Sequence, residues 1–181
     1  MSFDVFLMHF DRGQRTGADR AAVARLFREL GANALDGEGV YEVPIDDLRA
    51  SRRASEQEQY CIQINADGVE GNEEFTGCAM FLRAFSPGVA RVVYRIAEAG
   101  GLTIVSASDA PALLPPGVDP ADLPDEAYFV RHRRVTSAEE LYGALTDEYD
   151  QYCGWRDWAL SQATGAIPPP AARPGPGAHS E

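Results

Sequence analysis

Apolar positions in the first third of the chain follow first a strand-like and then a helix-like period. Residues 3–10 (FDVFLMHF) are apolar on both alternating faces, which predicts a strand in the middle of a sheet. Residues 19–31 repeat apolar side chains at i, i+3, i+4 and i+7, behind Asp19 as an N-cap. This pattern predicts an amphipathic helix that packs one face on the sheet.

Three more strands and a second helix are expected next. The stretches 39–44, 59–65 and 74–85 have the alternating or continuously apolar character of strands. Ser86 and the proline after it then predict a helix start, and the strand 102–106 follows a pair of glycines. This order predicts an α+β fold: a ferredoxin-like or split βαβ-type sheet with an additional strand and two helices packed on one of its faces.

The last third of the chain predicts a wrap and a C-terminal helix. Residues 109–126 carry five prolines, which disfavours both a helix and a central strand. Ser137 and Glu140 have the spacing of a capping box in front of an amphipathic helix over residues 141–160. The predicted core-facing stripe of that helix consists of Leu141, Leu145, Tyr149, Tyr152, Trp155 and Ala159.

Length and composition suit one domain, because 181 residues with 45% hydrophobic positions can bury one core. We expect a single globular domain over residues 1–162 and a disordered Pro/Gly-rich tail over 163–181. No apolar run reaches the roughly 18 residues that cross a bilayer, and the N-terminus lacks the pattern of a secretory signal. The three cysteines show no paired spacing. The sequence therefore predicts a cytoplasmic protein with reduced thiols and no membrane contact.

Charge narrows the range of partners. The chain has 28 acidic and 16 basic residues, all of the latter arginine, for a net charge of −12. Such a surface repels phosphate backbones, so we expect no nucleic-acid partner. It can steer a basic protein toward the domain, although net charge also serves solubility. The absence of lysine beside abundant Ala, Gly, Pro and Arg indicates a GC-rich coding sequence.

The polar side of the C-terminal helix holds the candidate partner-binding residues. Asp147, Asp150 and Asp157 project opposite the apolar stripe, and Trp158 falls at its rim beside these acids. A large indole surrounded by acids has the composition of an interface anchor. The alternative is that Trp158 covers the proline-rich wrap within the same molecule.

Reactive residues form no recognisable catalytic motif in the sequence. There is no GxSxG, P-loop or HExxH pattern, and residues 63–74 match a calcium-binding loop incompletely, with the neutral Gln63 at its first position. We therefore predict no metal and no cofactor. His9 and Cys61 on neighbouring strands would be a possible nucleophile and base, and His132 is a third ionisable group near a strand.

Four stretches, taken in order, carry a resemblance to known sequences. They are MSFDVFL, GCAMFLRAFSPGVARVVYRIAEAGGLTIV, LLPPGVDPADLP and EYDQYCGWRDWAL. Together they resemble a group of small uncharacterised proteins from GC-rich bacteria of the actinomycete type. The resemblance implies a compact cytoplasmic domain from a repertoire in which toxin-immunity proteins are common, and it assigns no functional residue.

Two functional hypotheses remain open. The first is an acidic, non-enzymatic and immunity-like interaction domain that binds a basic protein partner. The second is a small enzyme or ligand-binding domain whose pocket lies between the sheet and the 109–126 wrap and uses His9, Cys61 or His132. They differ in whether these reactive groups converge in one cleft.

Overall fold

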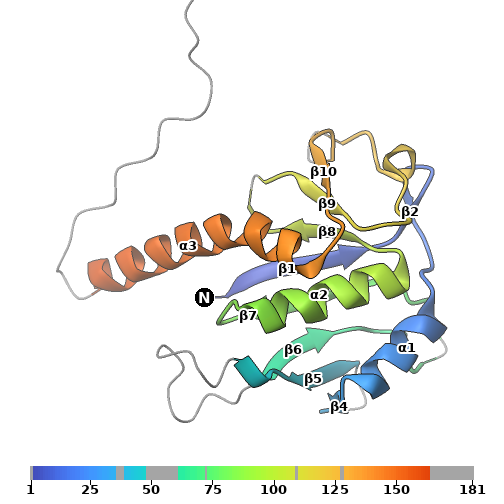
Figure 1. Cartoon of the computed structure of the whole chain (residues 1–181), viewed down its shortest axis with the longest axis horizontal. Helices are drawn as coiled ribbons and strands as arrows, with labels where there is room; N and C mark the ends of the chain where they lie inside the picture. Colours follow the sequence, from blue (N-terminus) through green and yellow to red (C-terminus); the bar gives the residue numbers. More distant parts are fainter. Residues whose placement is uncertain are drawn as a thin grey trace, which may run out of the picture.

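The computed structural model describes residues 2–35, 39–47, 61–71, 73–108, 110–126 and 129–163. Eight strands within these residues form one sheet in the order β10-β9-β8-β1-β7-β6-β5-β4 (Figure 1). Their bounds are β1 Phe3–Met8, β4 Asn33–Ala34, β5 Val40–Pro44, β6 Cys61–Asn65, β7 Gly77–Leu82, β8 Thr103–Ser106, β9 Ala112–Leu114 and β10 His132–Arg134. The β9–β10 pair is parallel and the other neighbouring pairs are antiparallel.

Three α-helices pack on the sheet: α1 Arg20–Glu29, α2 Pro87–Gly100 and α3 Ala138–Ala163. A small hairpin of β2 Phe10–Asp11 and β3 Gln14–Arg15 and the short 3-10 helix η2 Pro120–Asp122 complete the described elements. No helix in these parts of the chain combines the length and the apolar character that crossing a bilayer requires.

The expected α+β class is confirmed, but the sheet is larger than the expected ferredoxin-like unit. The four central strands β8-β1-β7-β6 have antiparallel neighbours, with β7 inserted between β1 and β6 as in a split βαβ unit. The sheet continues past this unit on both sides, and α3 adds a third helix. The whole is therefore a mixed eight-stranded sheet with three helices and not a clear two-helix ferredoxin-like fold.

The two first helices begin and end where their capping residues predict. Asp19 accepts a hydrogen bond from the backbone N–H of Ala22 at 2.9 Å, and the Ser86 hydroxyl accepts one from Val89 at 3.2 Å. Gly101 closes α2 in the left-handed region, with φ of 62°. These local signals fix where each helix starts on the sheet.

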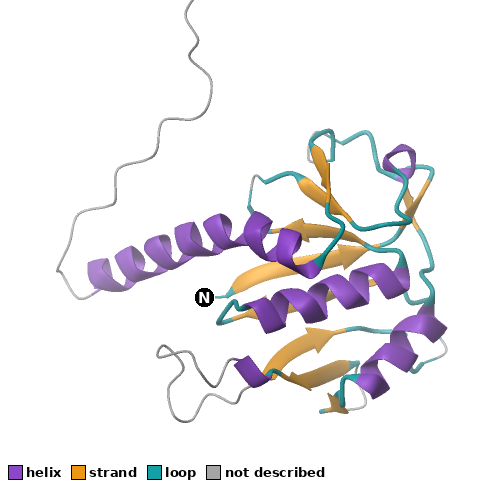
Figure 2. Ribbon diagram, viewed as in Figure 1, coloured by secondary structure: helices purple, strands orange, loops and turns teal. Residues whose placement is uncertain are grey.

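The main core lies between the sheet and the helices, which cover the same face (Figure 2). Alternate residues of β1 face this core and are at most 4% exposed: Phe3, Val5 and Leu7. The helices contribute buried residues such as Phe27, Ile96 and Leu145. This one-sided cover follows from the period-2 alternation of the strands.

A second, smaller core lies on the opposite face, where the proline-rich wrap packs. Its buried members are Val105, Ala112, Leu114, Val118, Leu123 and Phe129, against the half-buried Phe6, Met8 and Phe10. The wrap is held to the β2–β3 hairpin at Asp122, whose carbonyl accepts a hydrogen bond from Gly13 N–H at 2.9 Å and whose carboxylate accepts one from Arg12 N–H at 3.3 Å. The space between sheet and wrap is thus occupied by packed side chains.

One prediction for this segment is wrong, because Ala112–Leu114 forms a strand inside the sheet between β8 and β10. The prolines of the segment flank these three residues on both sides and leave their own N–H groups available for pairing. The predicted C-terminal helix runs to Ala163, one residue past the expected domain boundary. The rest of the predicted tail lies outside the described residues.

Candidate interaction surface on the C-terminal helix

The predicted capping residues Ser137 and Glu140 fix the start of α3. The Glu140 carboxylate accepts its hydrogen bond from Thr136 and not from Ser137, which the capping box would use. The Ser137 hydroxyl accepts a hydrogen bond from Glu140 N–H at 3.2 Å, and the Glu140 carboxylate accepts one from Thr136 N–H at 2.7 Å. These bonds with Thr136, together with the nearby positive charge of Arg133, lower the pKa of Glu140. The helix is therefore anchored immediately after β10.

The first half of α3 packs tightly against α2 and the sheet. Leu141 is fully buried and Leu145 is 1% exposed. The ring of Tyr142 stacks on Phe85, just before α2, with centroids 5.5 Å apart. Aromatic and aliphatic contacts on one stripe thus hold this half of the helix to the domain.

A partly buried polar cluster connects the middle of α3 to the end of β8. The Glu148 carboxylate accepts hydrogen bonds from Ser106 and Ser108, the latter at 2.7 Å. The two hydroxyls lie 2.8 Å from each other, and Ser106 is only 5% exposed. A half-buried carboxylate in this position is stabilised by these donors, because an unpaired one would lose its solvation without compensation. This cluster is a structural connection that the sequence did not single out.

Two tyrosines close the packed part of the helix around Phe3. The ring centroids of Tyr149 and Tyr152 lie 5.6 and 6.0 Å from that of Phe3. The Tyr149 hydroxyl donates to the backbone carbonyl of Arg83 at 3.1 Å, whereas the buried Tyr152 hydroxyl has no hydrogen-bond partner. Burial, with a smaller contribution from Cys153, raises the pKa of Tyr149.

The C-terminal part of α3 extends past the ends of the strands and past the N-terminus (Figure 1). Trp155 is 58% exposed there, so its predicted place in the core-facing stripe is wrong. Leu160 is also 58% exposed. A 26-residue helix is about 39 Å long, whereas a six-residue strand spans about 20 Å. The stripe therefore continues past the sheet that would have covered it.

The four predicted partner-binding residues lie within residues 147–160 of α3, which we call the distal α3 surface. Asp147 and Asp150 flank the packed residues Glu148 and Tyr149, and Asp157 and Trp158 lie on the projecting part. Asp147, Asp150 and Asp157 are exposed, and Asp157 pairs with Arg156 at 2.9 Å. Trp158 is half-buried and meets Trp155 edge to face, with centroids 5.2 Å apart. Its indole N–H is buried without a hydrogen-bond partner. Because the wrap packs on the opposite face of the sheet, Trp158 does not cover it.

The residues of the enzyme hypothesis do not converge. Strand β7 separates β1, which His9 follows, from β6, which holds Cys61. The His9 N–H donates to the Thr76 carbonyl, just before β7. The β6–β7 pairs Ile64–Met80 and Asn65–Ala79, continued in the same antiparallel register, put Cys61 beside the opposite end of β7, roughly 20 Å away. His132 is exposed on β10 at the other edge of the sheet.

The environment of Cys61 also argues against a nucleophile. Burial, together with the nearby Glu42 carboxylate, raises the pKa of its thiol, whereas an activated cysteine needs a lowered pKa. Within the described ranges, no group of three or more His, Cys, Asp or Glu side chains is arranged to hold a metal ion.

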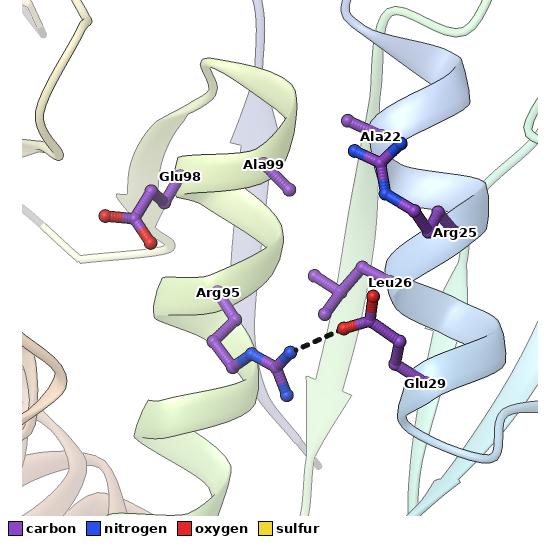
Figure 3. A pocket seen from close by; sticks show the side chains of 7 residues that line it. All are labelled: Ala22, Arg25, Leu26, Glu29, Arg95, Glu98 and Ala99. Atoms are coloured by element: carbon purple, nitrogen blue, oxygen red, sulfur yellow. Dashed lines mark hydrogen bonds and ion pairs between the residues drawn. The ribbon is translucent and has the colours of Figure 1, made fainter.

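A cavity of about 210 Å³ lies between α1 and α2 (Figure 3). Its walls carry Arg25, Glu29, Arg95 and Glu98, and Arg95 donates to Glu29 at 2.9 Å across the two helices. Figure 3 shows Leu26 and Arg95 pointing into the space between the helices and Glu98 pointing away from it. None of the predicted site residues lines this cavity, and its ion pair is an ordinary contact between adjacent exposed helices.

Comparisons of the chain with models of protein families, with curated proteins and with solved structures found no match. The role of α3 is therefore inferred from its own charges, contacts and exposure.

Proposed function

We propose that this protein is an acidic, non-enzymatic interaction domain that binds a basic protein partner through the distal α3 surface. The observation that supports this is the projection of α3 beyond the sheet, which leaves Trp155 more than half exposed on a helix that carries exposed aspartates. Tryptophan is enriched among the residues that dominate binding energy at protein interfaces.

The charge of the helix supports a basic partner. Residues 138–163 contain six acidic side chains and one arginine, in a chain of net charge −12. Acidic side chains on a projecting helix attract a basic protein over about one Debye length, roughly 8 Å at physiological salt. In this arrangement the aspartates raise the association rate, and the exposed indole slows dissociation.

An immunity-like role is the more specific form of the proposal. In this form the acidic domain occludes a basic toxin such as a nuclease, by the same charge complementarity that attracts the toxin to nucleic acid. A toxin gene directly beside the gene for this protein would support this form. An interaction with a basic partner that has no toxic activity would leave only the general form standing.

The test isolates local charge from net charge. One variant carries Asp147→Asn, Asp150→Asn and Asp157→Asn. The matched control carries Glu73→Gln, Asp125→Asn and Glu126→Gln, which are exposed and lie outside α3, so the two variants have the same net charge. Both are compared with the wild-type protein in binding to a partner captured from host extract at low salt.

We expect the α3 variant to lower the association rate by about tenfold and to weaken its salt dependence, with a much smaller change in the control. Equal effects of the two variants would show that only net charge matters and would refute the assigned surface. Binding that is indifferent to salt, or no protein partner at low salt, would refute the function.

A further inference from the structure

One apolar stripe runs along α3, and the structure covers only its first half. Leu141 and Leu145 are buried under α2 and the sheet, whereas Tyr152 and Ala159 are half-buried and Trp155 is exposed. All five positions fall on one face of the helix, within about 80° of arc. The same face thus changes from core to surface along a single helix.

The cover ends where α2 begins. Phe85, just before the first residue of α2, contacts both Tyr142 and Tyr149, with ring centroids 5.5 and 5.8 Å apart. From there α2 runs back toward the start of α3, since the charge of Arg91 acts on Glu139. The distal part of α3 therefore extends past the N-terminal end of α2 (Figure 1).

We infer that a basic amphipathic helix of the partner occupies this uncovered stripe, in line with the position that α2 holds on the first half. This inference rests on the proposed function and names the partner element. Beyond the packed tyrosines, the uncovered face from Trp155 to Ser161 is one helix wide and about 10 Å long, so it is complementary to another helix. Recognition of helices through apolar anchors on one face is a common mode, and Trp155 and Ala159, four residues apart, lie on one face of α3.

The charges on α3 select among possible occupants. A second copy would bring the same acidic helix against itself, and an anionic membrane would be repelled in the same way. Arginine or lysine on the partner helix would instead be attracted by the net negative charge of α3, which carries six acidic side chains and one arginine, and can stack on the exposed ring of Trp155. The edge-to-face contact with Trp158 limits the motion of Trp155, so less side-chain freedom is lost on binding.

The experiment uses the full chain and its own fluorescence. The chain has two tryptophans, and both lie on the distal α3 surface, so their emission reports on this surface alone. The probe is a labelled synthetic helix of about five turns with a leucine stripe bordered by arginine. A second peptide has glutamate in place of arginine, and a third has the composition of the first in scrambled order. Binding is measured by anisotropy of the label, and its location by the tryptophan emission maximum.

We expect saturable binding of the arginine peptide with a blue shift of emission, and at least tenfold weaker binding of the glutamate and scrambled peptides. Trp155→Ala should weaken binding by about tenfold or more. The control Phe81→Ala removes an aromatic ring that is 41% exposed on the other face of the sheet, and it should leave binding unchanged. Ala159→Arg places a positive charge on the stripe and should abolish binding of the arginine peptide. This variant is the replacement test if Trp155→Ala does not fold.

Three results would overturn the inference. The first is binding of the arginine peptide that is unchanged in both Trp155→Ala and Ala159→Arg. The second is a blue shift of emission that grows with protein concentration without peptide, which would indicate a second copy as the occupant. The third is a blue shift with vesicles of anionic lipid, which would indicate a membrane. A folded basic partner that binds in a manner dependent on the three aspartates, without any response to the peptide, would reject the helix and retain the function. Failure of both tests would reject both.

Discussion

The two halves of α3 share one apolar stripe and differ in how much of it the rest of the domain covers. In the first half Leu145 and Tyr149 pack on α2 and Phe3, and in the second half Trp155 continues the same stripe into solvent. The difference arises because the strands and α2 end while the helix goes on. Periodicity therefore identifies the apolar face of a helix, but the neighbouring elements decide whether that face is core or interface.

Truncation of one apolar residue in each half should give the largest contrast. Leu145→Ala removes a side chain that is 1% exposed and should lower the free energy of unfolding by about 2–5 kcal/mol. Trp155→Ala should change it by less than about 1 kcal/mol, because the ring is already mostly solvated. Urea unfolding followed by circular dichroism measures both. Similar losses would show that the second half of α3 is packed in solution.

The polar cluster between the two halves should have the next largest effect. Glu148→Gln keeps the shape of the side chain but replaces a charged acceptor of two hydroxyls, so it should cost about 1.5–3 kcal/mol of stability. The neighbouring Asp150→Asn, on an exposed position, is the control and should stay within about 0.5 kcal/mol. Equal midpoints of unfolding for the two variants would contradict a stabilising role of the cluster.

Two adjacent tyrosines provide a finer comparison at the end of the packed half. Tyr149→Phe removes a hydroxyl that donates to the Arg83 carbonyl and should lower stability by about 0.5–1.5 kcal/mol. Tyr152→Phe removes a buried hydroxyl without a partner and should leave stability unchanged or raise it. Thermal unfolding of both variants at one pH decides this, and a larger loss for Tyr152→Phe would be inconsistent with the unpaired hydroxyl.

The smallest expected effects come from the two glycines of α3. Gly143 and Gly154 are both exposed, and a Cβ atom added at either would meet nothing within 4 Å. Replacement by alanine should therefore stabilise the first half by about 0.5–1 kcal/mol, as expected for a helix interior. The gain at Gly154 should be smaller, because the projecting half contributes less to cooperative unfolding. Urea midpoints compare the two, and an equal gain would place both halves in one cooperative unit.

Local signals predicted much of the fold. Asp19, Ser86 and Ser137 cap the three helices as their spacing indicates, and the alternation in Cys61–Asn65 buries Ile62 and Ile64. The strand Ala112–Leu114 was missed because proline frequency over a window hides three residues that pair between prolines. The exposure of Trp155 had an available signal, since the length of the predicted helix exceeds that of the strands.

The amino-acid sequence by itself determined the local elements, the acidic character of the surface and the position of Asp147, Asp150 and Asp157 on one side of the last helix. Each of these depends on residues within a few turns of one another. Tertiary structure alone decided that β7 separates His9 from Cys61, that Glu148 meets Ser106, and that it is the second half of α3, and not the first, that extends past the sheet. These depend on strand order and on where elements distant in the chain end, which no local period encodes.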